Sequence, residues 1–224
     1  MSRSSPATSG RARARSGRAR SSRPRSRSSR RSSLGRGRVL AFVVAGGLAA
    51  VGGAAIIGLG PFGDALREFT LPLRHDDIIR QQASDKGLDA ALIAAIIYEE
   101  SRFRDQTSQA GARGLMQITP ATADFIARDS GGTEFVQGDL AEPQINIAYG
   151  SYYLHYLLDR YHGDVELAAA AYNAGETNVN RWLADADGDL EVAEIPFPET
   201  RAYVSNVLER RDEYAEHYAD DLGL

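Results

Sequence analysis

The sequence contains no cysteine among its 224 residues. This absence excludes a disulfide framework, a thiol nucleophile and a thiolate metal site. No glycine-rich phosphate-binding loop follows a predicted strand, and the histidines show no spacing typical of metal ligands: His75, His155, His162 and His217. We therefore expect no metal and no cofactor.

Residues 1–38 lack acidic side chains altogether and contain, after Met1, a single large apolar one, Leu34. Thirteen arginines alternate there with Ser, Gly, Ala and Pro, which gives the segment a charge of +13. Too little apolar surface is available to offset the entropy lost when a backbone becomes ordered. The segment is predicted to be a disordered tail.

Residues 39–60 lack charge, and this run of 22 residues has no strongly polar side chain. A helix of that length extends about 33 Å, enough to cross a hydrocarbon core of about 30 Å. The arginine excess on its N-terminal side predicts a signal anchor with residues 1–38 in the cytoplasm and residues 61–224 outside it. A cleaved signal peptide is the alternative, and residues 29–34 weakly resemble a twin-arginine export signal.

The net charge of −4 is thus a sum over two compartments. Residues 39–224 hold 13 basic and 30 acidic side chains, a net charge of −17. We expect the basic tail to contact anionic lipid. Membrane topology alone explains its charge, so nucleic-acid binding is not expected, although a run of like charges also attracts phosphates.

Residues 61–75 are predicted to form a juxtamembrane linker, and residues 76–219 a single domain of ordinary size. The pattern in the domain is helical and lacks persuasive period-two alternation, so the predicted fold class is all-α. Residues suited to begin a helix precede the apolar runs: Asp76, Asp89, Thr119 with Pro120, Pro143 and Asp164. A last amphipathic stretch runs from about Glu199 to Tyr218.

An acidic residue interrupts the apolar face of the helix predicted over residues 89–103. Glu100 lies seven and four residues after Ile93 and Ile96 and three before Phe103, a position that helical periodicity reserves for the core. Burial disfavours a carboxylate and raises its pKa, as a general acid near neutrality requires. The simpler interpretation is an ion pair between this glutamate and a nearby arginine: Arg102, Arg104 or Arg113.

Four motifs, in a fixed order along the chain, help to decide between a general acid and an ion pair for Glu100. Glu100-Ser101, Gly114-Leu115-Met116-Gln117-Ile118 and Ala171-Tyr172-Asn173-Ala174-Gly175 resemble the motifs of the soluble lytic transglycosylase (SLT) domain family. The segment Ile195 to Val204 resembles the C-terminal signature of that family. The resemblance covers most of residues 76–218 and implies a lysozyme-like, all-α fold.

The resemblance also implies an activity: cleavage, without water, of the β-1,4 bond between N-acetylmuramic acid and N-acetylglucosamine in peptidoglycan, which leaves a 1,6-anhydromuramic end. The resemblance assigns the role of single catalytic acid and base to Glu100, the same residue that helical periodicity places on the apolar face. The residues that the resemblance and its motifs suggest for substrate binding are Ser101, Met116, Gln117, Tyr172, Asn173 and Tyr203. Ser101 could equally satisfy local backbone.

Other functions remain compatible with these motifs. One is a water-using muramidase of the same fold, and another is a non-catalytic domain that binds glycan or acts as a scaffold. A third is a membrane-tethered nucleic-acid binder that acts through the arginine tail. The favoured interpretation is a single-pass protein of the bacterial cytoplasmic membrane with an extracytoplasmic catalytic domain and peptidoglycan strands as its partner.

Overall fold

The computed structural model describes residues 69–131 and 135–224. The predicted tail and membrane span, and the linker up to residue 68, lie outside the described residues. The described part is helical, with α3 Asp76–Lys86, α4 Ala90–Ser101, α5 Pro120–Asp129, η1 Gln137–Ala141, α6 Pro143–Arg160, α7 Val165–Ala174, α8 Glu176–Asp185, η2 Val192–Glu194, α9 Pro198–His217 and α10 Ala219–Leu222.

In this part of the chain, β structure is limited to isolated bridges from Arg113 to Thr107 and Ile118. The all-α prediction is therefore confirmed for the described residues. None of their helices combines the length and apolar character needed to cross a bilayer.

Local hydrogen bonds explain where several helices begin. The side chain of Asp89 accepts from the backbone N–H groups of Ala91 and Leu92, and Asp164 accepts from Leu167. Thr119 caps α5 in the same way, ahead of a proline in its first turn. These caps confirm the prediction. Asp76 also begins a helix, as the first residue of α3, but it does not cap that helix, because His75 occupies the cap position in a left-handed conformation.

The helix that carries Glu100 ends at Ser101, two residues earlier than predicted. Arg102 and Phe103 both have left-handed backbones, with φ of 53° and 59°, and this conformation breaks the helical hydrogen-bond ladder. Phe103 is nevertheless buried. It reaches the core through the turn that follows the helix, and not through helical phase.

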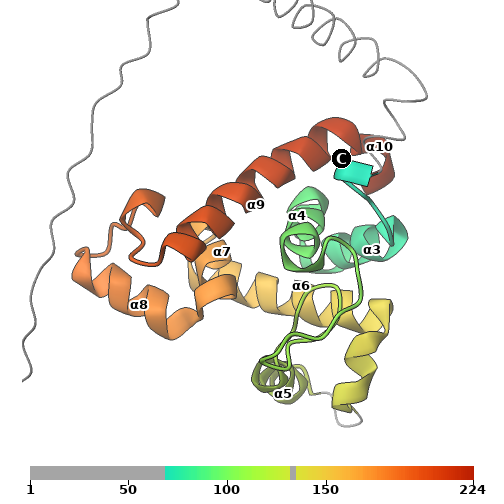
Figure 1. The fold of residues 1–224 in the computed structure, drawn as a ribbon, viewed down its shortest axis with the longest axis horizontal. Helices are drawn as coiled ribbons and strands as arrows, with labels where there is room; N and C mark the ends of the chain where they lie inside the picture. Colours follow the sequence, from blue (N-terminus) through green and yellow to red (C-terminus); the bar gives the residue numbers. More distant parts are fainter. Residues whose placement is uncertain (1–68, 132–134) are drawn as a thin grey trace, which may run out of the picture. The chain divides into compact units, whose positions relative to one another are not determined.

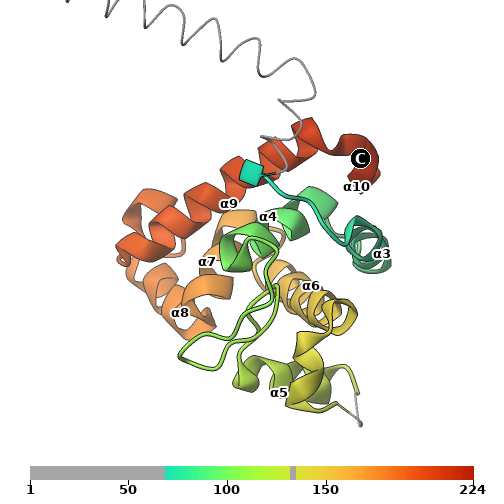
Figure 2. The same ribbon diagram turned by 45° about the vertical axis from the view of Figure 1, so that its right-hand side comes forward.

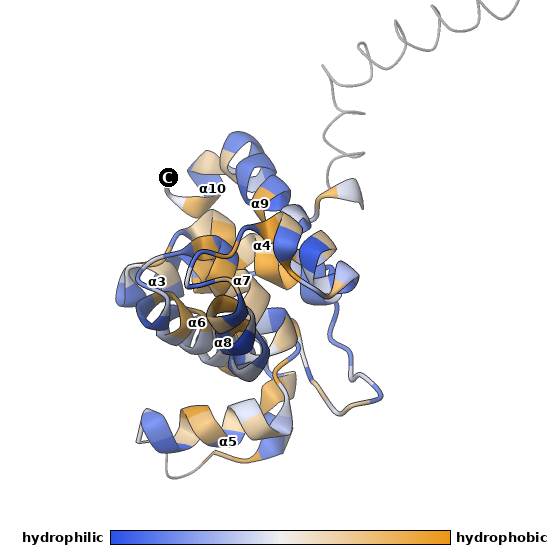
Figure 3. Cartoon of the chain, turned by 90° about the vertical axis from the view of Figure 1, so that its left-hand side faces the viewer, coloured by the Kyte–Doolittle hydropathy of each residue, from blue (hydrophilic) through white to orange (hydrophobic). Residues whose placement is uncertain are grey.

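Helix α4 lies at the centre of the domain, with α9 running across it and across α7, while α6 packs against α3 and α7 (Figures 1 and 2). All residues from Ala90 to Ile97 are buried, so α4 is apolar around its whole circumference there and not on one face as predicted. Figure 3 shows the contrast between the mostly hydrophobic α4 and the mostly hydrophilic α9. Within the described residues, the core extends from Leu71 to Leu222.

Candidate active site around Glu100

Glu100 occupies the last turn of α4, half-buried, and its side chain reaches α9. The hydroxyl of Tyr203, itself buried, donates to Oε1 of Glu100 at 2.7 Å. Burial raises the pKa of Glu100 from 4.5 to about 7; the Tyr203 hydrogen bond works against this rise, and the charge of Glu99 adds to it. The group can therefore donate or accept a proton near neutrality.

The alternative interpretation paired Glu100 with Arg102, Arg104 or Arg113, but the ion pair that the structure contains joins the neighbouring Glu99 to Arg210. Oε2 of Glu99 accepts from Nδ2 of Asn206 at 3.2 Å, and Oε1 of Glu99 lies 3.9 Å from Nε of Arg210. Between residues 69 and 224, with 132–134 aside, no arginine forms an ion pair with Glu100. The two adjacent glutamates thus have different environments, and Glu100 is the one suited to proton transfer.

Helix α7 supplies Tyr172, which lies near this carboxylate, and Asn173, which contacts α9, the helix that carries Tyr203. The hydroxyl of Tyr172 donates to the carbonyl oxygen of Met116 at 2.9 Å. Its pKa is raised well above the usual value by burial and by the nearby charge of Glu100. Asn173 is exposed, and its Oδ1 accepts from the buried hydroxyl of Thr200 at 2.8 Å. No protein atom among the described residues accepts from its Nδ2.

Gln117 lies in the loop before α5, where its backbone is left-handed with φ of 46°. Its Nε2 donates to the carbonyl oxygens of Gln106 and Gly114 at 3.0 and 2.8 Å. Gln106 in turn donates to the carbonyl oxygen of Glu100 at 3.1 Å. These bonds connect the loop to the end of α4, so that Gln117 and Glu100 belong to one structural unit.

Met116 differs from the prediction, because its side chain is fully buried and points into the core. A methyl group on Gly150 of α6 would lie 2.2 Å from the sulfur of Met116, which shows how closely that side chain packs. Only the backbone of Met116 serves the site, through the carbonyl that holds Tyr172. A side-chain contact with substrate is therefore incompatible with this arrangement.

Ser101 is buried as well, and its hydroxyl donates to the carbonyl oxygen of Ile97 at 3.2 Å. Of the two interpretations of Ser101, local backbone satisfaction agrees with this contact. The four tyrosines of α6 are half-buried packing residues: the rings of Tyr149, Tyr153 and Tyr156 lie against other aromatic rings, and the hydroxyl of Tyr152 donates to Oδ2 of Asp129 at 2.7 Å. The ring centroids of Tyr153 and Tyr172 lie 5.5 Å apart, so Tyr153 packs against a tyrosine of the site.

Asn146 is a residue of the site that sequence analysis missed. It is fully buried on α6, and Oδ1 accepts from the backbone N–H of Met116 at 2.7 Å. Its Nδ2 donates to the carbonyl oxygens of Arg113 and Leu140 at 2.9 and 3.0 Å. The signal that could have revealed it is an amide on the buried face of a helix, beside Ile147.

The described residues contain no group of three or more His, Asp or Glu side chains arranged to hold a metal ion.

Comparison with known proteins agrees with this geometry. The model of the transglycosylase SLT domain family matches residues 77–192. The soluble lytic murein transglycosylase of Salmonella typhimurium is 36% identical over 165 residues, which cover 71% of this chain and 25% of that protein. Membrane-bound lytic murein transglycosylase F of Pasteurella multocida is 38% identical over 95 residues, which cover 39% of this chain and 18% of that protein.

The solved structure of the 70 kDa soluble lytic transglycosylase of Escherichia coli superposes with a TM-score of 0.65 at 33% sequence identity, covering 69% of this chain and 26% of that one. The chain thus spans about a quarter of the length of the Salmonella relative. The family model, the shared helical fold and the order of the motifs agree. This chain belongs to the transglycosylase SLT domain family.

Proposed function

We propose that the protein is a membrane-anchored lytic transglycosylase that cleaves the N-acetylmuramic acid to N-acetylglucosamine β-1,4 bond of peptidoglycan and forms 1,6-anhydromuramic ends. The observation that carries the proposal is the environment of Glu100, a half-buried carboxyl group with a pKa of about 7 and a 2.7 Å hydrogen bond from Tyr203. The neighbouring carboxylate, Glu99, is already bound to Asn206 and Arg210.

A single carboxyl group can perform both proton transfers of this reaction. Protonated Glu100 donates to the glycosidic oxygen while the bond from that oxygen to the anomeric carbon breaks and the acetamido carbonyl oxygen attacks the same carbon. The resulting Glu100 carboxylate then removes the proton of the C6 hydroxyl. The C6 oxygen closes the anhydro ring, the acetamido group is released, and Glu100 is protonated again.

The acetamido group has to be held close to the anomeric carbon for this sequence to work. Asn173 is suited to that task, because Thr200 binds its oxygen and leaves its nitrogen as a donor for the acetamido carbonyl. Tyr172, held by the carbonyl of Met116, forms the adjacent wall. Gln117 presents an amide oxygen that no donor of the described residues reaches, and it is suited to bind a sugar hydroxyl or N-acetyl N–H.

Digestion of purified sacculi by residues 61–224, analysed by mass spectrometry, tests the proposal. Anhydro ends are lighter by one water than the ends left by hydrolysis, so a water-using muramidase would be recognised by its product mass. Glu100→Gln should lower the rate by about 10²–10⁴-fold. The matched variant Glu99→Gln should retain most activity. Undiminished cleavage by Glu100→Gln would contradict the mechanism.

Membrane anchoring is proposed from residues 39–60 and the asymmetry of arginine around them. Under this proposal the arginine tail serves topology, and wall cleavage should persist after deletion of residues 2–36. Loss of cleavage on that deletion, with the domain still folded, would favour a primary role for the tail in binding an anionic partner.

A further inference from the structure

A basic cavity of about 440 Å³ lies at the N-terminal end of the described domain. It does not include Glu100, and it is lined by Phe69, Thr70, Pro72, Arg74, Tyr98, Arg102 and Arg104. All three arginines are exposed, and no acidic side chain is part of the lining. The guanidinium of Arg102 lies 5.7 Å from the centroid of the Tyr98 ring.

These three arginines form a basic site on a domain whose net charge is negative. Residues 69–224 contain 12 basic and 28 acidic side chains, a net charge of −16. None of the ion pairs found among the described residues involves Arg74, Arg102 or Arg104. Three guanidinium groups in one cavity, with no carboxylate partner, provide a site for an anion, and their planar forks suit the oxygens of a phosphate.

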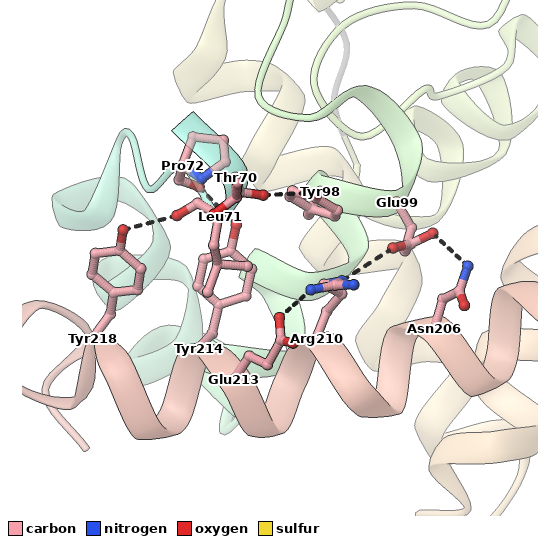
Figure 4. A network of polar contacts seen from close by, with 10 residues as sticks. All are labelled: Thr70, Leu71, Pro72, Tyr98, Glu99, Asn206, Arg210, Glu213, Tyr214 and Tyr218. Carbon is pink, nitrogen blue, oxygen red and sulfur yellow. Dashed lines mark hydrogen bonds and ion pairs between the residues drawn. The ribbon is translucent and has the colours of Figure 1, made fainter. Parts of the chain in front are cut away.

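The backbone that forms one wall of the cavity is firmly attached to the domain (Figure 4). Three tyrosine hydroxyls donate to three successive carbonyl oxygens: Tyr98 to Thr70 at 3.0 Å, Tyr218 to Leu71 at 2.8 Å and Tyr214 to Pro72 at 2.7 Å. The side chain of Leu71 is buried in the core. Residues 70–72, predicted as part of a linker, therefore pack on α4 and α9, so the cavity is an integral part of the domain.

Phe69 immediately precedes this attached segment and has 86% of its surface exposed. The predicted membrane span ends at Gly60, and the intervening chain extends at most about 30 Å even when fully stretched. The cavity and Phe69 therefore lie within reach of the membrane surface from which the chain emerges. Exposed aromatic side chains beside arginines are typical of surfaces that contact a lipid interface.

We propose that this cavity binds the phosphate of an anionic phospholipid in the same membrane, with Phe69 contacting the lipid interface. The proposal rests on the predicted span at residues 39–60, and it goes beyond the cleavage reaction. Binding would hold the domain in one orientation on the membrane. Because Arg102 directly follows α4, the contact would also hold Glu100 at a defined distance from the bilayer.

Hydrogen exchange on the full chain in nanodiscs tests the proposal. Discs of phosphatidylcholine alone are compared with discs that also contain phosphatidylglycerol. The amides of residues 69–75 and 102–105 should exchange at least about fivefold more slowly in the anionic discs, the factor that a single basic side chain gains near an anionic surface. The triple variant Arg74→Gln/Arg102→Gln/Arg104→Gln should lose this protection.

A matched variant, Arg128→Gln/Arg160→Gln/Arg181→Gln, removes the same charge elsewhere on the domain and should keep the protection. Phe69→Ser changes an exposed side chain without disturbing the core and should weaken it. Equal exchange in both kinds of disc would overturn the proposal, as would equal loss in the two triple variants. Two other outcomes would also overturn the proposal. If inorganic phosphate alone protects these amides in phosphatidylcholine discs, the cavity is a site for a free anion. If only soluble muropeptides protect them, the cavity is a site for a glycan-peptide fragment.

Discussion

The Glu100 carboxyl group should make the folded domain less stable as the pH rises, and Glu100→Gln should remove this effect. Its pKa is about 7 in the folded protein against 4.5 for a free group. The folded state therefore binds a proton more tightly than the unfolded state does. The stabilisation that results is fully present below pH 4.5 and is lost as the pH rises through about 7.

The difference of about 2.5 pKa units corresponds to about 3 kcal/mol, at about 1.4 kcal/mol per unit. Above pH 7 the wild-type domain is destabilised by this free energy, because its charged carboxylate is kept from water. A glutamine at the same position is uncharged and has no such cost. The Gln side chain can still accept from Tyr203 through its carbonyl oxygen. The stability advantage of Glu100→Gln over the wild type should thus grow by about 2 kcal/mol between pH 5 and pH 8.

Urea unfolding of residues 61–224 at several pH values between 4 and 9 measures this advantage directly. Glu209→Gln serves as the control, because it removes one negative charge from an exposed position of α9. Above pH 7 the same variant, Glu100→Gln, should be more stable than the wild type and yet about 10²–10⁴-fold less active. An advantage that stays constant from pH 5 to pH 8 would refute the argument, because burial of the charged form would then carry no free-energy penalty.

Three further substitutions test the surroundings of the carboxyl group. Tyr203→Phe removes the hydrogen bond that lowers the pKa of Glu100, so the alkaline limb of the pH–rate profile should move to higher pH; an unmoved limb would contradict this role. Gly150→Ala should lower stability by about 1–3 kcal/mol in thermal melts, because its methyl group would overlap Met116; the control is Gly138→Ala, whose added methyl meets no neighbour within 4 Å. Asn146→Ala leaves the buried N–H of Met116 and the carbonyl group of Leu140 without their partner, while the Arg113 carbonyl keeps its bond from Ile118, and should cost about 2–3 kcal/mol; a loss below about 1 kcal/mol would show that these groups find other partners.

Local interactions made much of the fold predictable. Asp89, Thr119 and Asp164 cap helices through bonds to backbone groups two or three residues ahead, so their effect depends on little beyond the neighbouring sequence. Glu100 could be selected over Glu99 because both lie on one helix and differ by about 100° in direction. The family could also be recognised without a structure, because the order of the motifs is a property of the chain itself.

Tertiary packing decided the direction of individual side chains in the site. Met116 was expected to face substrate, but the space left by Gly150 and the hydrogen bond from its backbone to Asn146, 30 residues away, turn its side chain into the core. The contact between Tyr203 and Glu100 joins residues 103 positions apart. No local pattern specifies such a pair, because it forms only when α9 crosses α4.

The helical fold class, the family and the carboxyl group most suited to proton transfer could all be predicted from the sequence, because each depends on composition, motif order or helical phase. The partners of the two glutamates could not be predicted and follow from helix packing, which brings Asn206 and Arg210 to Glu99 and Tyr203 to Glu100. It also brought three tyrosine hydroxyls onto residues 70–72 and gathered three arginines beside them. These arrangements depend on burial and on distances between segments far apart in the chain, which one-dimensional patterns do not encode.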